Sequence, residues 1–340
     1  MRNLTGVSRT RTAWLVTAVM VSIGTSAWAD ACKGPPERTD ITFMADWLPT
    51  TSTQGGFWQA KLKGYYEEAG LNVEIVAPAN PADPIKLVAR QRVDFALSYT
   101  PEIMIARDTG IPVIAIGSSA RNLVSGLVAL PESGITKAAD FKGKTLGVGA
   151  QLQATSFTAT ALASGGLTKD DVKIVDPGYS ATQLLVEGKV DAVYGLSYFE
   201  QLVADMIRQK EGKAPVVFLN YRDLGVPPLY YQLVVANEDF LASHPNTACH
   251  FLDASKRGIL DWVKDGDLVT KYVAEQEDYF TLEQHQRSYE MARNDWLAAD
   301  GSVFTMEEEP WKLGQDWALK YGLITVGSDP KSYFTNAYIP

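Results

Sequence analysis

Histidine and cysteine are scarce in this sequence, whose 340 residues include three histidines and two cysteines. The histidines, His244, His250 and His285, all lie in the C-terminal third. Most acid–base and triad arrangements need a histidine beside the reacting atoms, so the sequence offers little to the common forms of hydrolytic catalysis. No group of His, Cys and acidic residues has the spacing of a zinc site, and we expect no metal.

Phosphate-binding glycine patterns are also missing. The stretch GVGAQ, residues 147–151, is too short for a phosphate fingerprint, and no Walker or G-x-G-x-x-G pattern follows an expected strand. We therefore expect no resident cofactor. The two cysteines, Cys32 and Cys249, lie outside any C-x-x-C spacing. In an oxidising compartment they could form a disulfide or stay free thiols, and the sequence leaves both alternatives open.

Long apolar runs are absent beyond the N-terminus. There, a basic start with three arginines precedes a short apolar run, Ala13–Gly24, and Ala27 and Ala29 stand where a signal peptidase cleaves. We predict a signal peptide over residues 1–29 and a periplasmic protein. The alternatives are a retained anchor, or a lipoprotein on Cys32, which follows a poor lipobox.

Basic residues are outnumbered by acidic ones, and the formal charge is −9. Without residues 1–29 and their three arginines, 28 basic and 40 acidic side chains remain, which gives −12. An acidic surface disfavours nucleic acid and anionic membranes as partners. We expect a monomer that binds a small molecule.

Strand-like and helix-like segments alternate between about residues 40 and 235. The pattern begins with the apolar stretch ITFMAD, followed by an expected helix, Gln54–Ala69, that stops at Gly70. Repeated units of this length imply right-handed crossovers and mostly parallel sheets covered by helices. From about residue 237 the expected elements are helices. The sequence therefore predicts an α/β fold with a helical C-terminal region.

Two segments echo each other, RVDFALSYTPE at 92–102 and KVDAVYGLSYFE at 189–200. Each has a Val-Asp pair, an apolar strand, and an aromatic turn that opens a helix. We predict two similar α/β lobes joined by two hinge crossings, near Leu123–Leu130 and Tyr230–Ala236, with the C-terminal helices packed on the first lobe. The expected limits are 38–128 and 234–340 for the first lobe and 129–233 for the second.

In open α/β sheets, ligands bind where strands end and loops lead into helices. Two facing lobes would bring four such turns to one cleft: Trp47–Gly55, Ser98–Pro101, Gly149–Ser156 and Gly195–Glu200. Their candidate binding residues are aromatic, hydroxyl, amide or acidic: Trp47, Thr50, Thr53, Gln54, Ser98, Tyr99, Gln151, Ser156, Tyr198, Phe199 and Glu200.

These turns contain no Arg or Lys, so a fully anionic ligand would depend on helix N-termini alone. A neutral or amino-bearing aromatic heterocycle fits better, because it could stack on the rings and donate to Glu200. The alternative for Trp47 is packing at a strand end. The alternative for Glu200 is a first-turn acid favoured by the helix dipole.

Several stretches resemble the periplasmic substrate-binding proteins of ABC importers, in the branch that binds pyrimidine precursors of thiamine. They are DWLPTTSTQGGFWQAKLKGYYEEAGLNVEI, NPADPIKLVARQRVDFALSYTPE and GVPPLYYQLVVAN. This branch is related to the alkanesulfonate, taurine and nitrate-binding group and to the fungal thiamine-pyrimidine synthase. The resemblance implies a type II periplasmic-binding-protein fold, and as partners an importer permease and its ATPase.

The ligand implied is formylaminopyrimidine or hydroxymethylpyrimidine, with a sulfonate or riboflavin as alternatives. In the pyrimidine binders the first turn reads W-x-P-N-x-x-H. Trp47 and Pro49 match, whereas Thr50 and Thr53 replace the Asn and the His. Phe199 and Glu200 match an aromatic–Glu pair, and Tyr230 best matches a binding tyrosine.

The synthase is the enzymatic alternative. It carries a lysine in the turn after the first Val-Asp strand and a cysteine-rich run further on. Here Ser98 stands at the lysine position, and GVPPLYYQLVV contains no cysteine. The resemblance therefore favours a binding protein over an enzyme.

Overall fold

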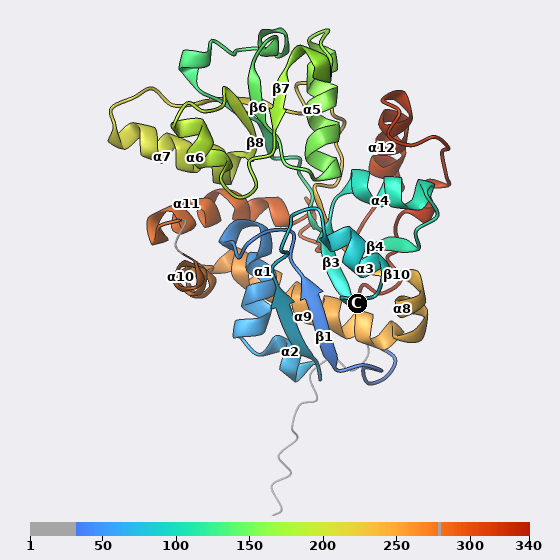
Figure 1. The fold of residues 1–340 in the computed structure, drawn as a ribbon. Helices are drawn as coiled ribbons and strands as arrows, with labels where there is room; N and C mark the ends of the chain where they lie inside the picture. The colour runs from blue at the N-terminus through green and yellow to red at the C-terminus, as the bar shows by residue number, and fades with distance from the viewer. Residues whose placement is uncertain (1–31, 278–279) are drawn as a thin grey trace, which may run out of the picture.

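A computed structural model describes residues 32–277 and 280–340 (Figure 1). The predicted signal peptide, residues 1–29, lies outside the described residues. Within the part of the chain that the structure describes, no helix has the length and apolar character that crossing a membrane requires.

The first lobe is built on a five-stranded sheet in which three neighbouring strands run parallel. Its strand order is β2-β1-β3-β10-β4, and β10 runs antiparallel to both of its neighbours. Phe43, Phe95 and Val234 are fully buried in it, as expected for a sheet covered on both faces. The strands are β1 (Asp40–Met44), β2 (Asn72–Val76), β3 (Phe95–Ser98), β4 (Val113–Ala120) and β10 (Gln232–Asn237).

The second lobe repeats this arrangement in the order β7-β6-β8-β5-β9. Here β5 is the reversed strand, antiparallel to β8 and β9. In each sheet the antiparallel strand is the first one after the chain crosses from the other lobe. The strands are β5 (Ser125–Ala129), β6 (Thr145–Gly147), β7 (Lys173–Val175), β8 (Ala192–Leu196) and β9 (Val217–Asn220).

Two crossings join the lobes, over residues 121–124 and 221–231. The predicted α/β fold with two lobes and two crossings is confirmed. The predicted lobe limits at 128 and 233 fall inside strands, because β5 already belongs to the second sheet and β10 to the first. A strand that pairs in one sheet cannot be divided between lobes.

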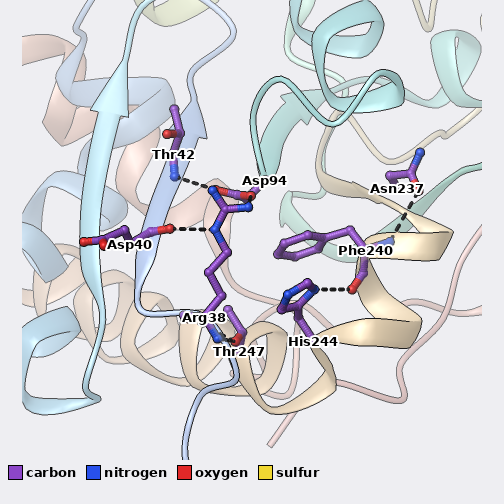
Figure 2. Close-up of polar contacts among 8 residues, drawn as sticks. All are labelled: Arg38, Asp40, Thr42, Asp94, Asn237, Phe240, His244 and Thr247. Atoms are coloured by element: carbon purple, nitrogen blue, oxygen red, sulfur yellow. Dashed lines mark hydrogen bonds and ion pairs between the residues drawn. The ribbon is translucent and has the colours of Figure 1, made fainter.

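The sequence echo between the lobes corresponds to a repeated hydrogen bond. Asp94, just before β3, accepts from the backbone N–H of Thr42 in β1 at 2.8 Å, and Asp191, just before β8, accepts from that of Thr145 in β6 at 2.8 Å. Figure 2 shows the first of these, where Arg38 also contacts Asp94 through Nη1 at 2.9 Å. Each aspartate thereby links the start of its own strand to the neighbouring parallel strand of the same sheet.

Helices flank both sheets, and Figure 1 shows the two lobes one above the other, each with its own helices. In the first lobe and the C-terminal region they are α1 (Thr51–Leu62), α2 (Tyr65–Glu68), α3 (Pro84–Ala89), α4 (Thr100–Asp108), α8 (Glu238–Ser243), α9 (Pro245–Lys264), α10 (Asp267–Gln276), α11 (Leu282–Ala292) and α12 (Glu308–Lys320). In the second lobe they are α5 (Leu152–Ser164), α6 (Ala181–Val186) and α7 (Leu202–Lys210).

The helix predicted over Gln54–Ala69 is two helices. Gly64 adopts φ 75° between α1 and α2, a left-handed conformation that ends the first of them. A π-helical turn, Ser197–Gln201, precedes α7 and carries Phe199 and Glu200.

Cys32 and Cys249 form a disulfide, which resolves the alternative that the sequence left open. It attaches the start of the described chain to α9. The same helix packs closely on α1, since a Cβ at Gly258 would lie 2.2 Å from the carbonyl oxygen of Gly56. The first lobe is thus held to the C-terminal region by a covalent bond and by a glycine-mediated helix contact.

The C-terminal helices contact both lobes. Helix α9 packs on α1 of the first lobe, as predicted. Trp317 of α12 contacts Phe157 of α5, at 5.6 Å between ring centroids, and donates through Nε1 to Thr160 Oγ1 at 3.0 Å. Helix α11 contacts the π-helical turn of the second lobe, beside which Phe280 meets Phe199 at 4.4 Å. The C-terminal helices thus contact the second lobe in addition to the first.

Candidate functional site

A cavity lies between the lobes, where strands of both sheets end. All four predicted turns contribute to its lining, and seven of the twelve candidate residues belong to it: Trp47, Thr50, Thr53, Tyr99, Gln151, Phe199 and Glu200. Its volume is about 600 Å³ with open solvent at its edge included. A cavity of this size suits one small molecule.

Ten other residues complete the lining. Most come from the second lobe, and several are small, so that backbone approaches the cavity. They are Asp46, Gly147, Gly149, Gln153, Pro177, Gly178, Ala181, Tyr194, Leu196 and Tyr231. None of them is among the twelve candidate residues predicted from the sequence.

The first turn brings two threonines to the cavity. Thr50 is the N-cap of α1, and its Oγ1 accepts from the backbone N–H of Thr53 at 3.3 Å. The two hydroxyls also hydrogen-bond each other at 2.7 Å. A hydroxyl has one donor and two acceptor positions, so this pair keeps acceptor capacity for a ligand.

Asp46 is a buried acid at the end of the first strand, 3% exposed. Its Oδ2 accepts from the hydroxyl of Tyr99 at 2.6 Å and from Nε2 of Gln232 at 2.8 Å, and its Oδ1 from Nε2 of Gln54 at 3.3 Å. Burial raises the pKa of Asp46, and these hydrogen bonds partly oppose the rise. It is held by neutral donors.

Glu200 provides a second buried acid from the opposite lobe. Its Oε2 accepts from the backbone N–H of Leu196 at 2.8 Å, so the side chain folds back over the end of β8. Gly195 makes room for it, since a Cβ there would lie 2.6 Å from Glu200 Cβ. Burial raises the pKa of Glu200 to about 7, against the lowering effect of the Leu196 N–H.

Three tyrosines form a polar group where the lobes meet. The Tyr99 and Tyr231 rings lie 5.5 Å apart, and the hydroxyls of Tyr194 and Tyr231 are 3.5 Å apart. Gln153 lies in the same lining, 2% exposed, and its Nε2 has no hydrogen-bond acceptor among the described residues. A buried donor without an acceptor in a cavity wall is a natural contact for a ligand.

Charge in the lining is of one sign. Asp46 and Glu200 are its ionisable acids, and none of the described lining residues is Lys or Arg. Across residues 32–277 and 280–340, no cluster of three or more His, Cys, Asp and Glu could hold a metal ion. The cavity therefore favours a ligand that donates hydrogen bonds or carries positive charge.

Five candidate residues lie outside the lining. Gln54 is engaged within its own loop, where it donates to the carbonyls of Trp47 and Leu48 and accepts from Trp58 Nε1. Ser98 donates to Glu102 Oε2 at 2.6 Å. The other three are Ser156, Tyr198 and Tyr230.

Ser156 and Tyr198 are buried on α5 and in the π-helical turn. Tyr230 lies at a crossing, where its hydroxyl accepts from the backbone N–H of Glu307 at 2.7 Å and its ring lies 5.4 Å from the guanidinium of Arg121. Its neighbour Tyr231 enters the cavity instead, because successive side chains of an extended chain point in opposite directions.

Tyr179 follows the lining residues Pro177 and Gly178 in the second lobe and bridges the two lobes beside the cavity. Its ring meets Trp47 edge-on at 4.6 Å, and its hydroxyl donates to the carbonyl of Pro78 at 2.9 Å. Trp47 and Pro78 belong to the first lobe. The side chain of Tyr179 therefore connects the second lobe to the first beside the cavity.

Two lobes with a cavity between them and two crossings behind it define a class, the periplasmic-binding-protein fold. The alkanesulfonate-binding protein SsuA from Xanthomonas axonopodis, solved bound to MOPS, superposes with a TM-score of 0.66 at 15% identity, covering 89% of this chain and 98% of that one. A Candida albicans protein described as having the generic periplasmic binding protein fold gives 0.63 at 15%, covering 88% and 97%. At these identities the likeness establishes the fold.

Within this class the chain belongs to the NMT1/THI5-like family, whose profile matches residues 52–268. The resemblance predicted from the sequence is thereby confirmed. The formylaminopyrimidine-binding protein of Halalkalibacterium halodurans is 29% identical over 223 residues, 66% of either chain.

A Haemophilus influenzae protein named for thiamine biosynthesis is 32% identical over 211 residues, 62% of this chain and 66% of that one. The match thus spans just under two thirds of these two relatives. A Schizosaccharomyces pombe 4-amino-5-hydroxymethyl-2-methylpyrimidine phosphate synthase is 25% identical over 304 residues, 88% of this chain and 86% of that one.

Proposed function

We propose that this chain is a periplasmic solute-binding protein that captures a pyrimidine precursor of thiamine in the interlobe cavity. The observation that carries the proposal is the cavity itself, which combines aromatic walls with two buried acids and has no Lys or Arg among its described lining residues. The formylaminopyrimidine-binding relative supports the ligand class. The protein would act as a monomer and deliver its ligand to an ABC importer permease driven by an ATPase.

A sulfonate is a weaker candidate, although a sulfonate-binding protein shares the fold. A sulfonate carries a full negative charge, which proteins usually meet with Arg, Lys or a helix N-terminus. In this cavity it would face Asp46 and Glu200 instead.

The second candidate function is pyrimidine synthesis, because fungal synthases match over 88% of the chain. Against it, Ser98 stands where the synthase carries a lysine, and it is already bonded to Glu102. The described lining also contains no histidine, cysteine or lysine that could act as a base or nucleophile.

A thermal-shift screen tests the proposal. Formylaminopyrimidine or hydroxymethylpyrimidine should raise the unfolding midpoint, because a ligand that binds the folded state stabilises it by mass action. Recovered pyrimidine should be chemically unchanged, and pyridoxal phosphate should give no Schiff-base absorbance. Stabilisation by an alkanesulfonate alone, or consumption of a protein side chain, would sink the proposal.

A further inference from the structure

Asp46 has an unusual set of partners for a buried acid. Three side chains donate to it, from Tyr99, Gln232 and Gln54, and all three are neutral. The backbone N–H of Asp46 also contacts its carboxylate, but among the three side chains only Gln54 donates to Oδ1, at the longest distance of 3.3 Å, so Oδ1 keeps a position for a better donor. Because Asp46 also lines the cavity, that position is available to a ligand.

The charge of Asp46 has no cationic partner among the described ion pairs. Buried charges are normally paired, because an isolated one loses its hydration without compensation. Neutral hydrogen bonds offset part of this desolvation free energy. A cation or a strong hydrogen-bond donor in the cavity would offset more of it.

The opposite wall has complementary features. Among the described residues, Glu200 accepts backbone hydrogen bonds alone, from the N–H of Leu196 through Oε2 at 2.8 Å and from its own N–H, so its carboxylate keeps capacity for a donor from a ligand. Gln153 presents Nε2, a buried donor without an acceptor. The cavity therefore offers an acid from each lobe and one unused amide donor.

We propose that Asp46 is a specificity-determining residue that, together with Glu200, selects a heterocycle carrying an amino group or protonated ring nitrogen. This inference rests on the proposed function and narrows its ligand class. One donor of the ligand pairs with Asp46 in the first lobe and another with Glu200 in the second. A ring nitrogen or carbonyl of the ligand accepts from Gln153.

The same arrangement rejects close analogues. If a carbonyl replaced the amino group of the ligand, its oxygen would face a carboxylate oxygen of the protein. Both atoms are acceptors, so no hydrogen bond could form between them. Sites that hydrogen-bond a particular group discriminate strongly against analogues that lack it, since the buried protein group is then unpaired. Selection therefore acts on the donor pattern of the ring edge as well as on ring size.

The test compares two probes, 4-amino-5-hydroxymethyl-2-methylpyrimidine and its 4-oxo analogue, by calorimetric titration. The parent should prefer the amino probe by roughly ten- to hundred-fold. Asp46→Asn, which keeps the shape but not the charge, should lower that preference by about ten-fold, and Glu200→Gln should do likewise. Asp205→Asn is the matched control, a partly buried acid of α7 that lies outside the cavity lining and accepts from the backbone N–H of Val216, and it should keep the parental preference.

The preference ratio separates selection from a structural role, because loss of folded protein lowers both affinities together. If the parent binds both probes equally, or Asp46→Asn keeps the parental ratio, this inference is wrong and the proposed function stands. The first of these outcomes needs no variant to fold. If the parent binds neither probe and formylaminopyrimidine gives no thermal shift, the proposed function fails and the inference fails with it.

Discussion

Trp47 stands between the first strand and α1, half-buried, with its ring against Tyr179 of the other lobe. Trp262 is equally large but lies fully buried in the C-terminal region, 5.0 Å from Trp296 and 5.3 Å from Tyr289. Substitutions of these two tryptophans should therefore affect different properties, ligand affinity for Trp47 and the free energy of unfolding for Trp262.

Trp47→Ala should weaken ligand binding by at least about ten-fold, since it removes a stacking surface and buried apolar area. Trp262→Ala should lower the free energy of unfolding by roughly 3–5 kcal/mol and leave the affinity of the folded fraction near the parental value. Titration and urea unfolding of both variants measure this. Parental affinity in Trp47→Ala would show that its ring does not contact the ligand.

Glu102 gives the stability a defined pH dependence. Burial raises its pKa from 4.5 to about 7, against the hydrogen bond from Ser98. Between these two values the unfolded chain releases a proton that the folded protein retains, so rising pH favours unfolding across this window. Below pH 4.5 the group is protonated in both states, and above about 7 it is ionised in both.

Urea unfolding of the parent and of Glu102→Gln should therefore diverge. The stability of the parent relative to the variant should fall as pH rises from about 4.5 to about 7 and stay constant above it. Subtracting the free energy of unfolding of one protein from that of the other removes the contributions of groups that titrate in both. Parallel profiles over this range would mean that Glu102 is not protonated in the folded protein at mildly acidic pH.

The cavity-lining residues that the sequence could indicate are those in polar turns after strands, such as Trp47, Thr50 and Glu200. Asp46 was missed because the first turn was counted from Trp47, one residue after the acid that ends the strand segment. Tyr231 was missed in favour of Tyr230, because neighbouring side chains in an extended chain point to opposite sides and sequence alone does not fix which side faces a cleft.

Helices α1 and α9 illustrate the element scale, because glycines bring them into contact. A Cβ at Gly258 would lie 2.2 Å from the backbone oxygen of Gly56 and 2.6 Å from Ala60 Cβ. Neither neighbour is the flexible end of a side chain. Any methyl group at this position must push the helices apart.

Gly258→Ala should lower the free energy of unfolding by roughly 1–3 kcal/mol, although alanine is the better helix former. Lys264→Ala, an exposed position in the last turn of the same helix, should change it by less than about 0.5 kcal/mol. Chemical denaturation compares the two. A stabilised Gly258→Ala protein would contradict the close packing of these helices.

Element types were more predictable than element limits. The β-α alternation followed from apolar strands and helix stops, and the Val-Asp echo indicated two similar lobes, each of which uses its aspartate in the same way. The break at Gly64 was not predicted, because an isolated glycine is tolerated inside many helices and the sequence does not show that this one adopts a left-handed φ of 75°.

At the scale of the whole molecule, the lobes are joined by two crossings and by the contacts of Tyr179 with Trp47 and Pro78. Ligand addition should reduce the radius of gyration measured by small-angle scattering, because the ligand contacts both lobes and favours the closed form. An unchanged profile with saturating ligand would argue against a moving cleft.

Tyr179→Ala should speed ligand release several-fold, since it removes a hydrogen bond and a ring contact that hold the lobes together. Tyr179→Phe keeps the ring and should have a smaller effect, which separates the two contributions. Stopped-flow displacement measures both rates. Equal rates of ligand release from all three proteins would show that the contacts of Tyr179 with the first lobe do not help to retain the ligand.

The bond between Cys32 and Cys249 spans 217 residues of sequence and encloses the whole second sheet within a covalent ring. A single protease cut anywhere between the two cysteines therefore cannot release a fragment. The nicked protein should migrate as one species on a non-reducing gel and as two after reduction, whereas a cut beyond Cys249 should give two species on both. Limited proteolysis would thus locate its own cut sites relative to the ring, and the enclosed lobe could be nicked without being lost.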